Sequence, residues 1–518
     1  MRRRWFAVLG VFLAAMLPAL ATAQAPLSLT SVRVAYMTQK AKARPQGELA
    51  ATLTALEREL AEAVRLGKTG EARRLLAKGM ALIAGTPWTP QREYARSLAL
   101  RTDHTIADSS KLLVVRLEQI YSPAIELPPT LSVRVTLTQR PQPAPGAATA
   151  TPGTPPAADA VVKSFEAVSP IARDLRDAPL SVDLDLRGVP DGSYRLRAEV
   201  TDGDQLLGST TLAIAVIDRL DDRLGRLSVG AQTVVEPVRA DVLSPVDYVR
   251  NVNLSRIGLG AAADLGRDLS KAEAVLTAAK SGRDPFVGRV GDITRHYLFE
   301  PAGEILPYRL YVPTTYNTSK PMPLIVALHG LGGSEASFFE AYERRLPTIA
   351  EKHGYILVTP LGYRPDGFYG WGVGEPPADP AARQLQERSE QDVMEVLARV
   401  RRDYRVDESR IYLMGHSMGA IGTWRLAAKY PDIWAALGLF SGTGTPATVE
   451  RMGGIAQVVV HGDDDPTVPV SGSRLMVAEM RRLGVEVQYI EVPGGDHNNV
   501  VPPNLEAVVS FFDTHRKK

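Results

Sequence analysis

The residues best suited to chemistry in this chain are Gly415-His416-Ser417-Met418-Gly419, which follow a short apolar run. A serine hydroxyl is a weak nucleophile unless a neighbouring base takes its proton and N–H groups stabilise the resulting charge. A Gly-x-Ser-x-Gly turn between a strand and a helix lifts the hydroxyl clear of a sheet, and its glycines leave room for the strand to fold back onto the helix. The pattern therefore predicts a nucleophile at Ser417.

A nucleophilic serine needs a base within hydrogen-bond reach, and histidine titrates near neutral pH. Of the eight histidines, His497 lies in a glycine-rich segment after the last predicted strand, where a loop can carry an imidazole over the carboxyl edge of a sheet. The turn is expected to point His416 elsewhere, and His329 and His461 are expected to brace loops. We therefore predict His497 as the base.

The histidine in turn needs a carboxylate that orients it and stabilises its charged form. Asp463, Asp464 and Asp465 follow the seventh predicted strand of the C-terminal half, and their spacing does not choose among them. A metal site is the competing interpretation of three aspartates, but no set of histidine or glutamate ligands lies near them in sequence. We expect no metal and no cofactor.

The segment from about residue 288 to 512 resembles the α/β-hydrolase superfamily. Within it, the sequence is similar to the secreted esterases grouped with polyhydroxybutyrate depolymerases and feruloyl esterases, and to prolyl-oligopeptidase-type hydrolases. The resemblance depends on the serine motif, on His-Gly-x-x-Asp-x-x-Val-Pro from His461, and on the chain order Ser, Asp, His. It implies that Asp465 is the acid. It also implies an oxyanion hole made by the N–H groups of Leu331 and Met418, with Gly330 as the near alternative to Leu331.

An aromatic, glycine-rich segment at 366–372 follows the fourth predicted strand. Trp371 and Tyr369 are predicted to form a wall for an aryl or hydrophobic acyl group, although aromatic residues in such a loop are equally often packing. His416 is assigned with them to the substrate-binding set.

From residue 288 to 518 strands alternate with helices, which predicts a mostly parallel, eight-stranded sheet covered on both faces. We expect strands at 293–299, 308–312, 324–328, 356–359, 410–414, 435–440, 457–460 and 486–491. Helices are expected at 335–353, 388–403, 418–430, 472–483 and 504–515. The serine would then follow the fifth strand.

The N-terminal half divides into four further segments. Residues 1–23, with Arg2, Arg3 and Arg4 before an uncharged apolar run, have the pattern of a signal peptide. Residues 24–90 are a helical segment with a hairpin over 47–84, and 91–218 show the short, alternating strands of an immunoglobulin-like β-sandwich. Within the sandwich, the Pro-, Ala- and Thr-rich stretch 140–160 is expected to be a disordered loop. Residues 219–287 form a helical connector.

Composition excludes several partners. Loss of the three arginines takes the formal net charge from +2 to −1, so nothing suggests a nucleic acid or, after signal cleavage, a membrane. The chain has no cysteine and therefore no disulfide. We expect an exported protein, periplasmic or extracellular, whose oligomeric state is unknown.

The predicted reaction is hydrolysis of a small-molecule or polymer ester through an acyl-enzyme. The alternative is a serine peptidase of prolyl-oligopeptidase type, although the chain has no blade repeat of the kind that forms a propeller. A third hypothesis is a binding protein built on an inactive hydrolase fold.

Overall fold

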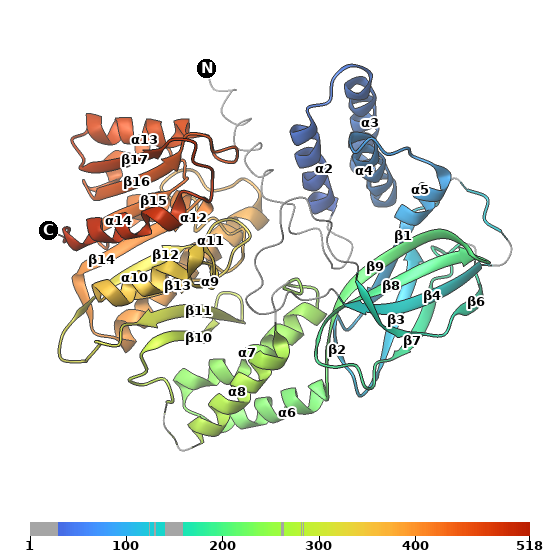
Figure 1. Ribbon diagram of the computed structural model, residues 1–518, viewed down its shortest axis with the longest axis horizontal. Helices are drawn as coiled ribbons and strands as arrows, with labels where there is room; N and C mark the ends of the chain where they lie inside the picture. Colours follow the sequence, from blue (N-terminus) through green and yellow to red (C-terminus); the bar gives the residue numbers. More distant parts are fainter. Residues whose placement is uncertain are drawn as a thin grey trace. The chain divides into compact units, whose positions relative to one another are not determined.

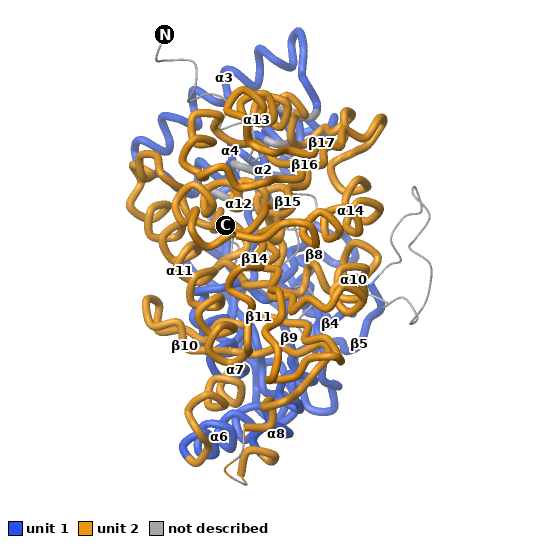
Figure 2. Tube along the Cα trace, turned by 90° about the vertical axis from the view of Figure 1, so that its left-hand side faces the viewer, with its two compact units in different colours: residues 1–232, 245–276 blue, residues 233–244, 277–518 orange. Residues whose placement is uncertain are grey.

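The computed structural model describes residues 29–123, 125–128, 131–139, 159–172, 174–260, 264–280, 282 and 284–517. Its contacts divide the chain into two compact units, residues 1–232 with 245–276, and residues 233–244 with 277–518 (Figure 2). The predicted signal peptide, residues 1–23, lies outside the described residues.

The second unit contains an eight-stranded sheet (Figure 1). Its strand order is β10-β11-β13-β12-β14-β15-β16-β17, antiparallel as far as β13 and parallel from there onward. The strands are β10 (Gly291–Phe299), β11 (Glu304–Val312), β12 (Met322–Leu328), β13 (Ile356–Pro360), β14 (Val406–His416), β15 (Ala436–Phe440), β16 (Ala456–Gly462) and β17 (Val487–Val492). The predicted alternation of strands and helices is confirmed, since each expected strand has a counterpart within a few residues.

Six α-helices of this unit accompany the sheet: α9 (Ser337–Glu340), α10 (Arg345–His353), α11 (Pro380–Asp403), α12 (Met418–Lys429), α13 (Ser471–Arg482) and α14 (Val501–Asp513). Residues of α10 and α14 bury one apolar core with side chains from β12, β14 and β16. In Figure 1 these two helices lie on the same side of the sheet. The strands β13, β15 and β16 are buried along their whole length, as expected of a sheet covered on both faces.

Two predicted helix boundaries in this unit are wrong. The single helix expected at 335–353 is broken between α9 and α10, because Tyr342, Glu343 and Arg344 all have positive φ angles, which no α-helix contains. Helix α11 begins at Pro380, eight residues earlier than expected. There Asp379 caps its N-terminus by accepting hydrogen bonds from Ala381 and Ala382.

The first unit contains a two-sheet β-sandwich around one apolar core. One sheet has the order β1-β3-β7, and the other has the order β2-β9-β8-β4-β5 with β6 also paired to β4. The strands are β1 (Leu98–Thr102), β2 (Ile106–Asp108), β3 (Leu112–Gln119), β4 (Leu131–Gln139), β5 (Ala160–Ser164), β6 (Val168–Ile171), β7 (Leu180–Asp185), β8 (Gly192–Asp202) and β9 (Gln205–Ile217). The immunoglobulin-like assignment stays a prediction.

Two expectations for the sandwich need correction or qualification. The predicted sandwich segment starts at residue 91, but its first residues form helix α5 (Pro90–Ser97), which Thr89 caps, and the first strand begins at Leu98. The stretch predicted to be a disordered loop lies outside the described residues, except that Asp159 is described and Ala160 begins β5.

Helices make up the rest of the first unit. Helices α2 (Leu29–Ala43), α3 (Gly47–Arg65) and α4 (Thr69–Ile83) share a small apolar core around Tyr36, and the predicted hairpin corresponds to α3 and α4. In the predicted connector, α6 (Leu220–Gly230) belongs to this unit, whereas α7 (Glu236–Asn253) and α8 (Leu265–Ala279) are each divided between the two units.

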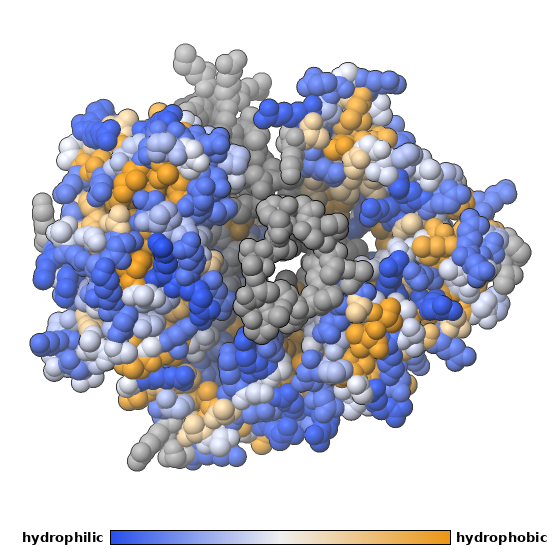
Figure 3. Space-filling view, in the orientation of Figure 1, coloured by the Kyte–Doolittle hydropathy of each residue, from blue (hydrophilic) through white to orange (hydrophobic). Residues whose placement is uncertain are grey.

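Apolar side chains are gathered inside these cores rather than on the surface. On the face shown in Figure 3, polar side chains predominate over both units, and apolar residues form separate small areas. None of the described helices combines the length and the apolar character that a membrane span requires.

Candidate active site

Ser417 lies at a sharp turn between the end of β14 and the start of α12. Its backbone has φ 56° and ψ −116°, a conformation that side-chain-bearing residues rarely adopt, and its N–H donates to the carbonyl of Phe440 at 2.8 Å. Strained conformations of this kind persist where the surrounding structure holds them, and they cluster at functional sites. The turn therefore presents a serine at the carboxyl edge of the sheet in the geometry expected of a nucleophile.

The glycines on both sides of Ser417 are required by close backbone contacts. A Cβ atom on Gly419 would lie 1.9 Å from the carbonyl oxygen of Leu328, and one on Gly415 would lie 2.3 Å from the carbonyl carbon of Gly419. Each neighbour is backbone, so a change of rotamer cannot relieve the clash. The motif predicted that Gly415 and Gly419 leave room for the strand to fold back onto the helix, and these contacts confirm it.

We expect Gly419→Ala to destabilise the C-terminal unit by at least about 3 kcal/mol, since an overpacked backbone contact costs roughly 1–3 kcal/mol even where some adjustment is possible. Urea unfolding followed by tryptophan fluorescence measures this, because Trp424 and Trp434 are buried in that unit. Gly374→Ala is the matched control, since a Cβ atom there meets nothing within 4 Å. Equal unfolding midpoints for the two variants would contradict the packing argument.

His497 lies in the loop between β17 and α14, with 2% of its surface exposed. Its Nδ1 lies 2.7 Å from Oδ2 of Asp465, and because a carboxylate only accepts hydrogen bonds, Nδ1 carries the proton. The other ring nitrogen, Nε2, is buried and has no hydrogen-bond partner within the described residues. The imidazole is thus arranged as a base with a free lone pair.

Asp465 is held in its ionised form by its neighbours. Its Oδ1 accepts hydrogen bonds from the N–H groups of Thr467 and Val468, at 2.7 and 2.9 Å. Burial by itself would raise the pKa of the Asp465 carboxyl, but hydrogen bonds from His461, His497 and the backbone lower that pKa below its usual range. The carboxylate stays charged at neutral pH and can stabilise an imidazolium at His497.

The two neighbouring aspartates are placed differently. Asp463 accepts a hydrogen bond from the N–H of Gly494 at 2.6 Å and so ties the β17–α14 loop to the β16 loop. The Asp464 side chain is exposed and makes no hydrogen bond within the described residues. Among those residues, no group of three histidine, aspartate or glutamate side chains is arranged to hold a metal ion.

Of the expected oxyanion donors, Met418 directly follows Ser417 at the start of α12. Gly330 lies close to the turn, because a Cβ atom built on it would be 3.4 Å from Cβ of Ser417. No hydrogen bond in the described part of the chain uses the N–H of Leu331 or of Met418. The Met418 N–H also opens helix α12, where the helix dipole favours negative charge. Two unused N–H groups are what an oxyanion hole requires.

Two of the three expected substrate-binding residues are buried and hydrogen-bonded within the protein. Tyr369 is fully buried, and its hydroxyl donates to the carbonyl of His329 at 3.1 Å, so it packs beneath the loop after β12. His416 is buried, with Nδ1 2.8 Å from the Tyr342 hydroxyl and Nε2 2.8 Å from the carbonyl of His497. Each side chain therefore uses its polar atoms within the protein, and the substrate-binding assignment of both residues stays a prediction. Trp371 is partly exposed, and the Lys429 ammonium lies 5.7 Å from its ring centre.

One residue of this network carries no sequence signal, and another has the role expected from the sequence. Tyr342 carries no motif and was included in a continuous helix, so no sequence signal pointed to its contact with His416. His461 braces a loop, as expected, with Nε2 2.9 Å from the carbonyl of Val468 and Nδ1 2.7 Å from the Ser473 hydroxyl. Its Nε2 also lies 3.2 Å from Oδ2 of Asp465, which the sequence did not indicate.

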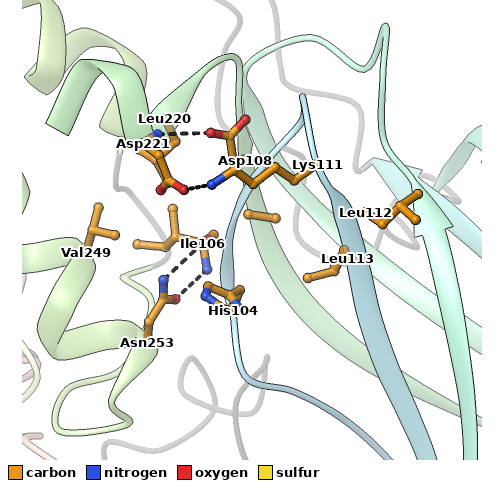
Figure 4. A pocket seen from close by; sticks show the side chains of 11 residues that line it. His104, Ile106, Asp108, Lys111, Leu112, Leu113, Leu220, Asp221, Val249 and Asn253 are labelled. Carbon is orange, nitrogen blue, oxygen red and sulfur yellow. Dashed lines mark hydrogen bonds and ion pairs between the residues drawn. The ribbon is translucent and has the colours of Figure 1, made fainter. Parts of the chain in front are cut away.

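A separate pocket lies in the first unit, between β2 and helices α6 and α7 (Figure 4). Asn253 accepts from the N–H of Ile106 at 2.9 Å and donates to its carbonyl at 3.2 Å. Asp108 accepts from the N–H of Asp221, and Lys111 forms an ion pair with the Asp221 carboxylate. These polar groups therefore join helix to sheet, and they do not converge on a position where a ligand could react.

Comparisons with known proteins find esterases similar to the C-terminal half. Residues 303–478 match the Esterase family, whose description reads "Putative esterase". A stretch of 135 residues is 36% identical to Feruloyl esterase B of Neurospora crassa and covers 26% of this chain and 42% of that protein. A stretch of 191 residues is 28% identical to Cutinase 2 of Thermobifida cellulosilytica and covers 36% of this chain and 64% of that protein.

A ferulic acid esterase of Anaeromyces mucronatus, solved in complex with ferulic acid, is 17% identical, with a TM-score of 0.36 over 44% of this chain and 92% of that one. Of the two curated relatives, Feruloyl esterase B and Cutinase 2, the chain spans less than two thirds of the length. The family and curated matches confirm the resemblance to esterases that the motifs indicated.

Proposed function

We propose that this chain, whose C-terminal unit is related to esterases of the α/β-hydrolase type, hydrolyses carboxylic esters with Ser417 as nucleophile, His497 as base and Asp465 as acid. One observation carries the proposal. The His497 ring is bound to Asp465 through Nδ1, and its buried Nε2 is left unpaired at the sheet edge that also holds the strained Ser417 turn. Catalytic hydrogen bonds are often long before substrate binds, so an unpaired Nε2 suits a resting enzyme.

Each step of the reaction has a group in this arrangement. The Nε2 atom of His497 takes the Ser417 proton as Oγ attacks the ester carbonyl, and the N–H groups of Leu331 and Met418 stabilise the oxyanion. The resulting imidazolium, held by Asp465, gives its proton to the departing alcohol. Water then enters and loses a proton to the same Nε2 atom as its oxygen attacks the acyl carbonyl. The bond to Ser417 Oγ breaks, Oγ takes the proton back from Nε2, and the carboxylic acid is released. No cofactor takes part in these steps.

The substrate class follows from the relatives and from the loop that carries Trp371. The curated relatives are named as feruloyl esterases and cutinases, which supports an aryl or aliphatic ester, small or polymeric. The exposed part of Trp371 supplies an aromatic surface for such an acyl group. The leader-like residues 1–23 support export, to the periplasm or beyond the cell.

A substrate panel on the chain from Gln24 onward tests the proposal. We expect turnover of acetyl, butyryl and feruloyl esters or of hydroxybutyrate oligomers, and covalent labelling of Ser417 by a fluorophosphonate, because the unpaired imidazole can activate the hydroxyl. Faster cleavage of short peptides than of every ester would replace the proposal with a serine peptidase. A wild-type protein that neither turns over esters nor reacts with the fluorophosphonate would leave an inactive fold that only binds.

A further inference from the structure

His416 connects the serine turn to the loop of the base. It is the last residue of β14, directly before Ser417, and its Nε2 lies 2.8 Å from the main-chain oxygen of His497. A carbonyl oxygen can only accept, so Nε2 carries a proton and donates it. This is the only hydrogen bond that the main chain of His497 makes within the described residues. The peptide of the base is therefore attached to the residue that precedes the nucleophile.

The Tyr342 hydroxyl faces the other ring nitrogen of His416, Nδ1. In a neutral imidazole with Nε2 protonated, Nδ1 must accept, and the Tyr342 hydroxyl lies 2.8 Å from it. Burial, together with the nearby His497 ring, lowers the pKa of His416 to about 3, so the ring is neutral at the pH at which esterases work. Burial also raises the pKa of the Tyr342 phenol, which keeps its proton available for donation.

The backbone that carries Tyr342 is unusual. Tyr342, Glu343 and Arg344 have φ angles of 51°, 58° and 56°, and side-chain-bearing residues adopt such angles singly more often than in a run. The Tyr342 ring packs against Phe338, with ring centres 5.2 Å apart, and edge-on against His416 at 5.5 Å. Strain of this kind persists only where surrounding contacts define the conformation. Here the break between α9 and α10 places a phenol against His416.

We propose that Tyr342 and His416 are positioning residues: Tyr342 fixes the tautomer of His416, and His416 holds the His497 peptide in register with Ser417. The inference rests on the proposed function. The catalytic imidazole is then fixed at two points, since Asp465 holds the ring at Nδ1 and His416 holds the main chain. Any shift of the Ser417 turn moves the anchor of its base with it. Correct relative placement of reacting groups is worth large factors in rate, and an error of about 1 Å costs roughly 100-fold.

Two variants of His416 distinguish the effect of its hydrogen-bond donor from the effect of its side-chain volume. His416→Leu removes the donor to the His497 carbonyl and should lower kcat by about 10- to 100-fold with little change in KM, because the base is displaced while the binding surface is kept. His416→Gln offers an amide N–H near the position of Nε2 and should recover most of the loss. Equal activities for the leucine and glutamine variants would overturn the proposal.

A double-mutant cycle tests the part assigned to Tyr342. Tyr342→Phe keeps the ring and should lower kcat by about 5- to 10-fold, the usual scale for one hydrogen bond. In the His416→Leu background the same change should have no further effect, because the acceptor is gone. Tyr355→Phe is the control: it removes another buried tyrosine's hydrogen bond, to Asp513 at 2.9 Å, and should leave kcat unchanged. Independent, multiplicative effects of Tyr342→Phe and His416→Leu would overturn the relay.

A spectroscopic measurement keeps the inference separate from the proposed activity. In the wild-type protein labelled with ¹⁵N-histidine, the resonances lost in His416→Gln should report a protonated Nε2 and an unprotonated Nδ1 that do not change between pH 5 and 8. A His416 ring that carries its proton on Nδ1, or that titrates in this range, would overturn the relay whether or not esters are hydrolysed. Absence of ester turnover together with the expected tautomer would count against the proposed function alone.

Discussion

Replacing Ser417 with alanine should lower kcat on p-nitrophenyl esters by roughly 10⁴- to 10⁶-fold, the scale seen when a serine nucleophile is removed from such a triad. The hydroxyl oxygen, Oγ, is the only heavy atom lost, and it is the atom that would form the bond to the acyl group. The remaining rate would come from binding and from the N–H groups of Leu331 and Met418. Fluorophosphonate labelling should disappear with the activity.

The fold should tolerate this change, because Ser417 contributes no side-chain hydrogen bond within the described residues and its main-chain bond to Phe440 remains. Circular dichroism and tryptophan fluorescence check this. Ser510→Ala removes an exposed serine hydroxyl on α14 and should leave activity within about twofold, since such surface substitutions are usually neutral. A Ser417→Ala protein that keeps a tenth of wild-type activity would exclude a covalent mechanism through this residue.

Asp465→Asn should lower kcat by roughly 10³- to 10⁴-fold with little change in KM, as expected when the acid of a triad becomes an amide. An asparagine side chain is neutral, and its amide N–H can donate to Nδ1 of His497. The ring then carries its proton on Nε2, which can no longer accept the Ser417 proton. The backbone bonds from Thr467 and Val468 need an acceptor, which the amide oxygen still supplies. Steady-state kinetics on a soluble ester measures the effect.

The neighbouring aspartates supply the matched controls. Asp464→Asn changes an exposed carboxylate without a hydrogen bond among the described residues and should leave kcat within about twofold. Asp463→Asn weakens the contact to Gly494 and should cost less than tenfold, the scale of one hydrogen bond. If Asp464→Asn were the more damaging change, the acid would have been assigned to the wrong residue.

Much of the C-terminal fold follows from local patterns. Predicted strands of four to seven residues alternate with helical segments after residue 288, and these periodicities depend only on neighbouring residues. The Ser417 turn is also local, since its strand, glycines and helix are contiguous in sequence. For this reason the predicted boundaries of the strands and of the Ser417 turn are close to those of the structure.

Other features depend on contacts that no local pattern contains. The break at Tyr342 interrupts a sequence with helical periodicity, and its conformation is supported by Phe338 and His416. Tyr369 lies among glycines, which indicated a loop residue facing a ligand, yet its ring is buried and its hydroxyl is bound to the carbonyl of His329. Burial is decided by the elements that pack over a residue, and these come from distant parts of the chain.

A serine in a glycine-bounded turn, aspartates after a strand and a histidine in a later loop are residue types in a known order, so local patterns were enough to predict serine-hydrolase chemistry. Which atoms come into contact depends on the folded chain. The fold brings Asp465 to Nδ1 of His497, leaves Asp464 exposed, and directs Nε2 of His416 toward the His497 carbonyl. Hydrogen bonds act over about 3 Å. These partners are up to 81 positions apart in sequence, and they come within that range only because the strands end at one edge of the folded sheet.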